Sequence, residues 1–127
     1  MEGKSIKKFI LVVEDDSFYG NVLKTKLTKE GYEVVLATDG EQAIKQVKGK
    51  KPDLMLLDLI MPVKDGFTTL SELKSDSDLK NIKVIVLSNL GQEEDITKAK
   101  TLGADDYLIK TNISIQEMMD KVKQYVE

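Results

Sequence analysis

The 127-residue chain contains no cysteine and no histidine. The first absence excludes disulfide bonds, thiolate metal sites and cysteine nucleophiles. The second removes the commonest general base and zinc ligand, and it excludes a role for this chain as a histidine phosphocarrier. Chemistry in this protein must therefore rest on carboxylates, hydroxyls and lysines.

Long apolar runs and a basic charge balance are also missing. The first apolar run, at residues 9–13, is too short for a signal peptide or a membrane span, so we expect a cytoplasmic protein without membrane insertion. The net charge of −3 argues against direct nucleic-acid binding, which needs a basic face. The chain length predicts a single domain over residues 1–127, with its core at about 8–126.

Short apolar runs alternate with helical patterns along the chain. The runs are rich in aliphatic and β-branched residues, which predicts strands buried on both faces at 9–13, 34–37, 54–57, 84–87 and 108–109. Apolar residues at helical spacing follow each run and predict a helix there. Residues typical of helix starts are Asp39, Asp65, and Ser114 with Glu117 in capping-box spacing. Residues typical of helix ends are Gly31, Gly49 and Gly103.

Five successive strand–helix units with short connections predict an α/β fold. A parallel sheet needs helices on both of its faces, and right-handed crossovers then favour a doubly wound five-stranded sheet with five helices. In such sheets, ligands bind at the carboxyl ends of the strands where the strand order reverses.

Polar residues follow four of the five predicted strands. With strand order 2-1-3-4-5, we expect Glu14, Asp15 and Asp58 to share one pocket, with Ser88 and Lys110 on its other wall. Asp16 is better read as a helix cap than as a ligand. Three carboxylates and one ammonium leave two net negative charges, which suits Mg²⁺ bound through oxygen ligands. An acidic metal site beside a lysine handles phosphoryl groups, and its best available nucleophile is a carboxylate.

These residues resemble the receiver domain of two-component response regulators. The resemblance rests on Glu14-Asp15, on Asp58 within DLIMPVKDG, on Ser88, and on Lys110 at the end of YLIK. It extends over about residues 8–126 and implies the flavodoxin-like fold with strand order 2-1-3-4-5.

The resemblance implies a role for each residue at the metal. Asp58 would be the phosphoacceptor and Asp15 a direct Mg²⁺ ligand. Glu14 would act on the metal through water, and the backbone carbonyl of Ile60 would complete the protein ligands. Pro62 and Gly66 would shape the loop after the acceptor strand.

The resemblance also implies a switch. Lys110 would pair with the phosphoryl group, the Ser88 hydroxyl would move to bind it, and Tyr107 would swing inward. The interaction surface would comprise the helix before Gly103, the last strand and the last helix. The phosphodonor would be a histidine kinase or phosphotransfer protein and the target a downstream protein, whereas monomer and phosphorylation-dependent dimer both stay open. Catalysis would be limited to self-phosphorylation and slow autodephosphorylation.

Three residues are expected to tune water access to the phosphoryl group. Ile60 and Leu90 are apolar and cannot hydrogen-bond an attacking water, and Asn89 adds bulk beside Ser88. We therefore expect a long-lived phosphoryl group. Most receivers have proline where Thr111 follows Lys110, and since a cis bond before a non-proline residue costs roughly 3–4 kcal/mol, we predict a trans peptide there.

Two other functions remain open from the residues. A Mg²⁺-dependent aspartyl-nucleophile phosphatase would need an acid two residues after the nucleophile, where this chain has Ile60. A flavodoxin-like cofactor binder would need a phosphate-binding loop after the first strand, and the acidic EDDSFYG segment has the wrong charge for an anion.

Overall fold

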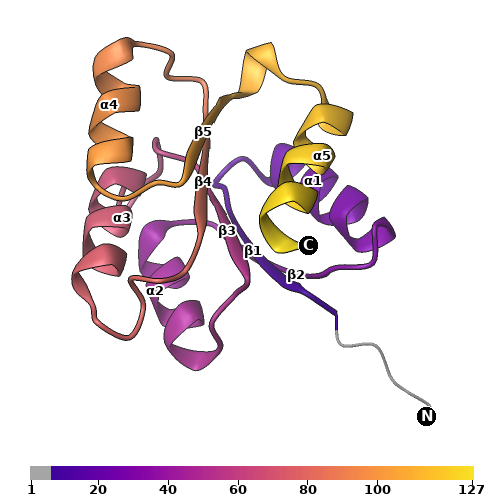
Figure 1. The fold of residues 1–127 in the computed structure, drawn as a ribbon, viewed down its shortest axis with the longest axis horizontal. Coiled ribbons are helices and arrows are strands. Elements are labelled where there is room, and N and C mark those ends of the chain that lie inside the picture. Colours follow the sequence, from indigo (N-terminus) through magenta and orange to yellow (C-terminus); the bar gives the residue numbers. More distant parts are fainter. Residues whose placement is uncertain (1–6) are drawn as a thin grey trace.

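The computed structural model describes residues 7–127, in which strands and helices alternate (Figure 1). The elements are β1 (Phe9–Val13), α1 (Ser17–Lys29), β2 (Glu33–Ala37), α2 (Gly40–Gly49), β3 (Leu54–Leu57), α3 (Gly66–Ser75), β4 (Val84–Ser88), α4 (Glu93–Thr101), β5 (Asp106–Ile109), the 3-10 turn η1 (Lys110–Asn112) and α5 (Ile115–Val126). No helix among these residues has the length and apolar character needed to cross a bilayer.

The five strands form one parallel sheet in the order β2-β1-β3-β4-β5. This confirms the predicted fold class and strand order. The strand bounds differ from the prediction mainly in β5, which begins at Asp106 because Asp106 and Tyr107 pair with Ile85 and Val86 of β4. The apolar pattern did not indicate this start, because β5 is an edge strand that is only partly buried and begins with polar residues.

Helices cover both faces of the sheet. Helices α1 and α5 lie on one face and α2, α3 and α4 on the other (Figure 1). Successive strand residues enter opposite cores: Leu11 of β1 packs toward α2 and α3, whereas Ile10 packs toward α1 and α5. Strands buried on both faces explain the continuous apolar runs in the sequence.

Side-chain caps fix where the helices begin. Asp16, Asp39, Asp65 and Ser114 each accept a hydrogen bond from a backbone N–H in the first turn of the helix that follows. The capping box predicted for α5 is present. Gly31 and Gly103 follow α1 and α4 with φ of 97° and 114°, a backbone conformation that favours glycine.

Gly66 lets the start of α3 pack directly on the β3 end. Its N–H donates to the Leu59 carbonyl (2.9 Å). A Cβ atom at this position would lie 2.2 Å from the backbone oxygen of Asp58 and 2.6 Å from the Leu59 Cα. Neither neighbour is the end of a flexible side chain, so only glycine fits.

Gly66→Ala is therefore expected to lower the free energy of unfolding by about 1–3 kcal/mol, because backbone must move to admit the methyl group. Urea denaturation measures this change. The control is Gly49→Ala at the exposed end of α2, where a Cβ meets no atom within 4 Å; it should be neutral or stabilise by up to about 1 kcal/mol. Equal stability of the two variants would refute the close-packing argument.

Candidate functional site

The sheet register places two acidic residues side by side. Val13 of β1 pairs with Leu57 of β3, so the next residues, Glu14 and Asp58, emerge together at the carboxyl edge. The Asp58 N–H donates to the Val13 carbonyl (3.0 Å), which fixes this alignment. Both side chains are buried, with relative exposures of 4% for Glu14 and 6% for Asp58.

Asp15 completes an oxygen cluster with these two residues. Carboxylate oxygens of Glu14, Asp15 and Asp58 all lie within 4.8 Å of one another, and Asp15 is the exposed member. Asp16 does not belong to this cluster; its carboxylate accepts from the N–H groups of Phe18 and Tyr19 and caps α1. The structure thus brings the three acids together and leaves Asp16 apart from them as a helix cap.

Lys110 supplies the opposing charge from the other end of the chain. Its Nζ lies 2.5 Å from Glu14 Oε1 and 3.4 Å from Asp58 Oδ2. The shorter contact is with Glu14, whereas the expected partner of Lys110 was a phosphoryl group on Asp58. The Lys110–Thr111 peptide is trans, as predicted, since residues 7–127 contain no cis peptide bond. The chain then forms η1.

Burial raises the pKa of Glu14 to about 7, and the nearby Asp58 charge acts in the same direction. The hydrogen bond from Lys110 is the largest opposing effect, followed by the Asp16 N–H, which donates to Glu14 Oε2 at 3.1 Å. The lysine therefore does not offset the burial of Glu14. The donor set therefore fits a hard divalent cation, which binds carboxylate oxygens.

Ser88, Leu90 and Tyr107 form a second group beside the acidic cluster. Ser88 ends β4 and is completely buried, and its Oγ accepts from the Leu90 N–H (3.2 Å). The Tyr107 hydroxyl donates to the Leu90 carbonyl (2.6 Å), and burial raises the Tyr107 pKa. Tyr107 is thus held against the β4–α4 connection. The adjacent Asn89 is exposed.

The loop between β3 and α3 leaves apolar side chains in solvent. Ile60 is 60% exposed and Val63 is 82% exposed. Val63 has a φ of 66°, and the Lys64 N–H donates to the Pro62 carbonyl (2.7 Å), which closes a γ-turn. Such a conformation is unfavourable for a β-branched residue, and it keeps Ile60 and Val63 out of the core.

Tyr19 is a site residue that sequence reasoning missed. It is not among the predicted site residues, yet the Lys110 Nζ lies 4.7 Å from the centroid of its ring. Its place three residues after Asp16, in the first turn beyond the acidic strand end, was the available signal. The residues were too far apart in sequence for this contact to be recognised.

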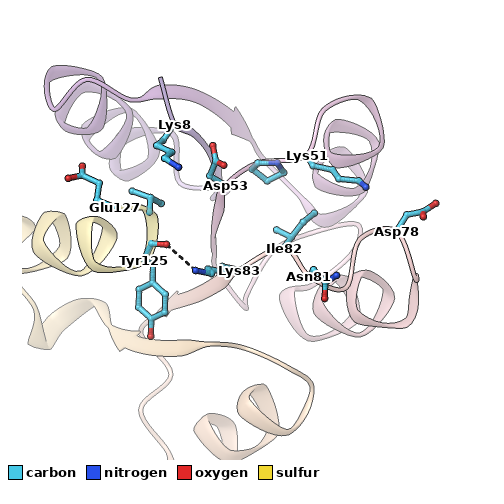
Figure 2. Close-up of a pocket in the computed structure, with 11 residues that line it drawn as sticks. Lys8, Lys51, Asp53, Asp78, Asn81, Ile82, Lys83, Tyr125 and Glu127 are labelled. Atoms are coloured by element: carbon cyan, nitrogen blue, oxygen red, sulfur yellow. Dashed lines mark hydrogen bonds between the residues drawn. The ribbon is translucent and has the colours of Figure 1, made fainter. Parts of the chain in front are cut away.

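A separate cavity of ≈ 460 Å³ lies at the amino ends of the strands (Figure 2). Its charged lining consists of three lysines and three acids: Lys8, Lys51, Lys83, Asp53, Asp78 and Glu127. These charges balance, and the Asp53 carboxylate is engaged by the Phe9 N–H (2.7 Å). None of the predicted site residues lines this cavity, so the carboxyl edge is the candidate site.

Comparison with known proteins agrees with this geometry. Residues 10–123 match the model of the response regulator receiver domain. The chain belongs to this family. A probable transcriptional regulator, ycf27 of Cyanophora paradoxa, is 43% identical over 104 residues, which are 82% of this chain and 42% of that protein. The chain thus spans less than half the length of that relative.

Solved receiver domains share the fold closely. The receiver domain of the Francisella response regulator 1452 has a TM-score of 0.86 and 31% identity, covering 94% of this chain and 97% of that one. The receiver domain of the sensor histidine kinase PA1611 from Pseudomonas aeruginosa has a TM-score of 0.86 and 26% identity, covering 95% and 98%. That structure has a magnesium ion coordinated in its active-site cleft.

Asp15→Asn is expected to raise the melting temperature in EDTA and to reduce the further rise that Mg²⁺ produces. The change removes one of three mutually repelling carboxylates, an effect of up to about 1 kcal/mol at an exposed position. Thermal melts with EDTA and with Mg²⁺ measure both effects.

Asp16→Asn is the matched control for this prediction. Asparagine caps helices as well as aspartate does, so this variant should keep the Mg²⁺ response of the parent. An Asp15→Asn variant that is clearly less stable in EDTA than the parent would contradict the repulsion argument.

Proposed function

We propose that this receiver accepts a phosphoryl group on Asp58 from a phosphohistidine of a partner kinase or phosphotransfer protein. The observation that carries the proposal is a buried carboxylate at the β3 tip, flanked by Glu14 and Asp15 and faced by Lys110. The donor's phosphorus–nitrogen bond would break as an Asp58 carboxylate oxygen forms a bond to phosphorus. The donor histidine must belong to another protein, because this chain has none.

Glu14, Asp15 and Asp58 would hold Mg²⁺, with the Ile60 carbonyl as a further ligand. The metal would supply positive charge that offsets the phosphoryl oxygens. Lys110 would contribute the same effect from the protein, since its ammonium already lies 3.4 Å from Asp58 Oδ2. The magnesium in the PA1611 receiver domain supports this assignment.

The output would be a protein contact made by α4, β5 and α5. Ser88 and Tyr107 both bond to Leu90, so a movement of the Ser88 hydroxyl toward a phosphoryl group would disturb the contact that holds Tyr107. The name of the ycf27 relative indicates transcriptional control in that protein. We propose that this chain influences such an output through a downstream effector and does not contact DNA through its own acidic surface.

The receiver assignment is favoured over an aspartyl-nucleophile phosphatase by the exposed apolar Ile60, two residues after Asp58. No acid is present there to protonate a leaving group. The flavodoxin-like binder is disfavoured by the three clustered carboxylates at the ends of β1 and β3, where an anionic cofactor would be repelled.

Asp58→Asn should abolish phosphorylation while leaving the fold intact, because the amide cannot attack phosphorus as a carboxylate does. Intact mass after incubation with acetyl phosphate and Mg²⁺ measures the adduct, and circular dichroism checks the fold. Asp120→Asn on the exposed face of α5 is the control and should carry one phosphoryl group, like the parent. A full adduct on the Asp58→Asn variant would refute the assignment of the acceptor.

Ile60→Asn with Leu90→Glu is expected to shorten the lifetime of the phosphoryl group by about three- to tenfold. Polar side chains can orient an attacking water, and a tenfold change corresponds to about 1.4 kcal/mol of barrier. Release of phosphate from purified phosphoprotein gives the rate.

Two further variants sharpen the lifetime measurement. Leu90 is partly buried and its backbone bonds to Ser88 and Tyr107, so Ile60→Asn alone separates water access from disturbance of that group. Val63→Asn changes an exposed apolar residue of the same loop and should leave the lifetime unchanged. If the parent decays as fast as the double variant, the apolar side chains do not limit hydrolysis.

A further inference from the structure

The ammonium of Lys110 has a third neighbour besides its two carboxylates. The ring of Tyr19 lies with its centroid 4.7 Å from Nζ, within the range of a cation–π interaction. The Lys110 side chain is only 13% exposed, and Tyr19 is half-buried. The ring therefore closes a side of the ammonium that would otherwise be open to water.

The backbone after Lys110 offers little restraint. Lys110 begins the 3-10 turn η1, whose other residues, Thr111 and Asn112, are exposed; the Thr111 hydroxyl donates to the Asn112 side-chain oxygen (3.4 Å). A lysine stem has four rotatable bonds, so its ammonium has many alternative positions unless packing excludes them. The face of the Tyr19 ring is a packing surface that can limit the positions of the Lys110 ammonium.

The two carboxylates alone do not fix the ammonium in the position that Asp58 requires. Glu14 lies nearer than Asp58, at 2.5 Å compared with 3.4 Å. If its side chain rotated freely, the Lys110 ammonium would pair with Glu14 alone or move into water. The ring on α1 prevents the second movement, because leaving the site would expose the ring face and break the contact.

We propose that Tyr19 is a positioning residue that holds the Lys110 ammonium over the Glu14–Asp58 pair through the face of its ring. The expected effect of this contact, efficient phosphoryl transfer to Asp58, rests on the proposed function. The ring does not itself touch the reacting atoms. Its hydroxyl is not required, since the interaction uses the aromatic face.

A double-mutant cycle in EDTA tests the contact without any phosphorylation. Tyr19→Leu, Lys110→Met and the double variant are compared with the parent by urea denaturation. We expect Tyr19→Leu to raise the unfolding equilibrium constant about three- to tenfold more in the Lys110 protein than in the Lys110→Met protein. Additive effects would show that the two side chains are not coupled and would overturn the inference.

The rate of phosphorylation by acetyl phosphate with Mg²⁺ tests the consequence. Tyr19→Leu should slow it about three- to tenfold, and Tyr19→Phe should restore the parent rate because it keeps the ring. Phe18→Leu is the matched control: Phe18 is the next residue of α1 and is 78% exposed, so its loss should not change the rate. In the Lys110→Met background, Tyr19→Leu should have no further effect.

The outcomes separate the two proposals. A parent that takes up no phosphoryl group would refute the proposed function, whatever the cycle in EDTA shows. A parent that is phosphorylated no faster than Tyr19→Leu would refute the positioning role alone. Loss of rate in Tyr19→Phe equal to that in Tyr19→Leu would assign the effect to the hydroxyl and would also overturn the role of the ring.

Discussion

Two carboxylates that backbone hydrogen bonds force together dominate the carboxyl edge of this sheet. The pairing of β1 with β3 buries Glu14 beside Asp58, and the strand register fixes the backbone positions of both residues. Burial of like charges is unfavourable unless a cation offsets them. Lys110 provides one such charge, and burial still raises the pKa of Glu14. The oxygen atoms of this cluster fit a further cation of the hard divalent kind.

The need for positive charge beside Glu14 and Asp58 brings distant parts of the chain into contact. Lys110 follows β5 at the sheet edge, yet its ammonium reaches the ends of the two central strands. Tyr107 lies three residues earlier on β5 and bonds to the β4–α4 connection. Under the proposed function, a change in the partners of Lys110 would act on the strand that carries Tyr107. A local change of charge would then have a route to the proposed interaction surface on α4, β5 and α5.

Local sequence signals predicted the strands, the helix caps and the acidic cluster, because each depends on neighbours in the chain or on strand ends that share an edge. The start of β5 was missed since Asp106 and Tyr107 lack the apolar character of a central strand. The preference of Lys110 for Glu14 and its contact with Tyr19 depend on side-chain directions from separate elements. Periodicity contains no information on such directions, so these contacts required the structure.

The loop that follows Asp58 shows how the fold maintains an unfavourable conformation at the site. A positive φ at a residue such as Val63 costs on the order of 1–3 kcal/mol. The adjacent Lys64 is held firmly: its carbonyl accepts from the Gly40 N–H (3.1 Å), and its ammonium pairs with carboxylates of α2 and α3. Gly66, two residues later, joins the end of the loop to its start, because its N–H donates to the Leu59 carbonyl (2.9 Å). These contacts restrain the loop around Val63, and Ile60 stays exposed two residues after Asp58. Two helices that take no direct part in the chemistry thus set the position of the residue that we expect to control access of water.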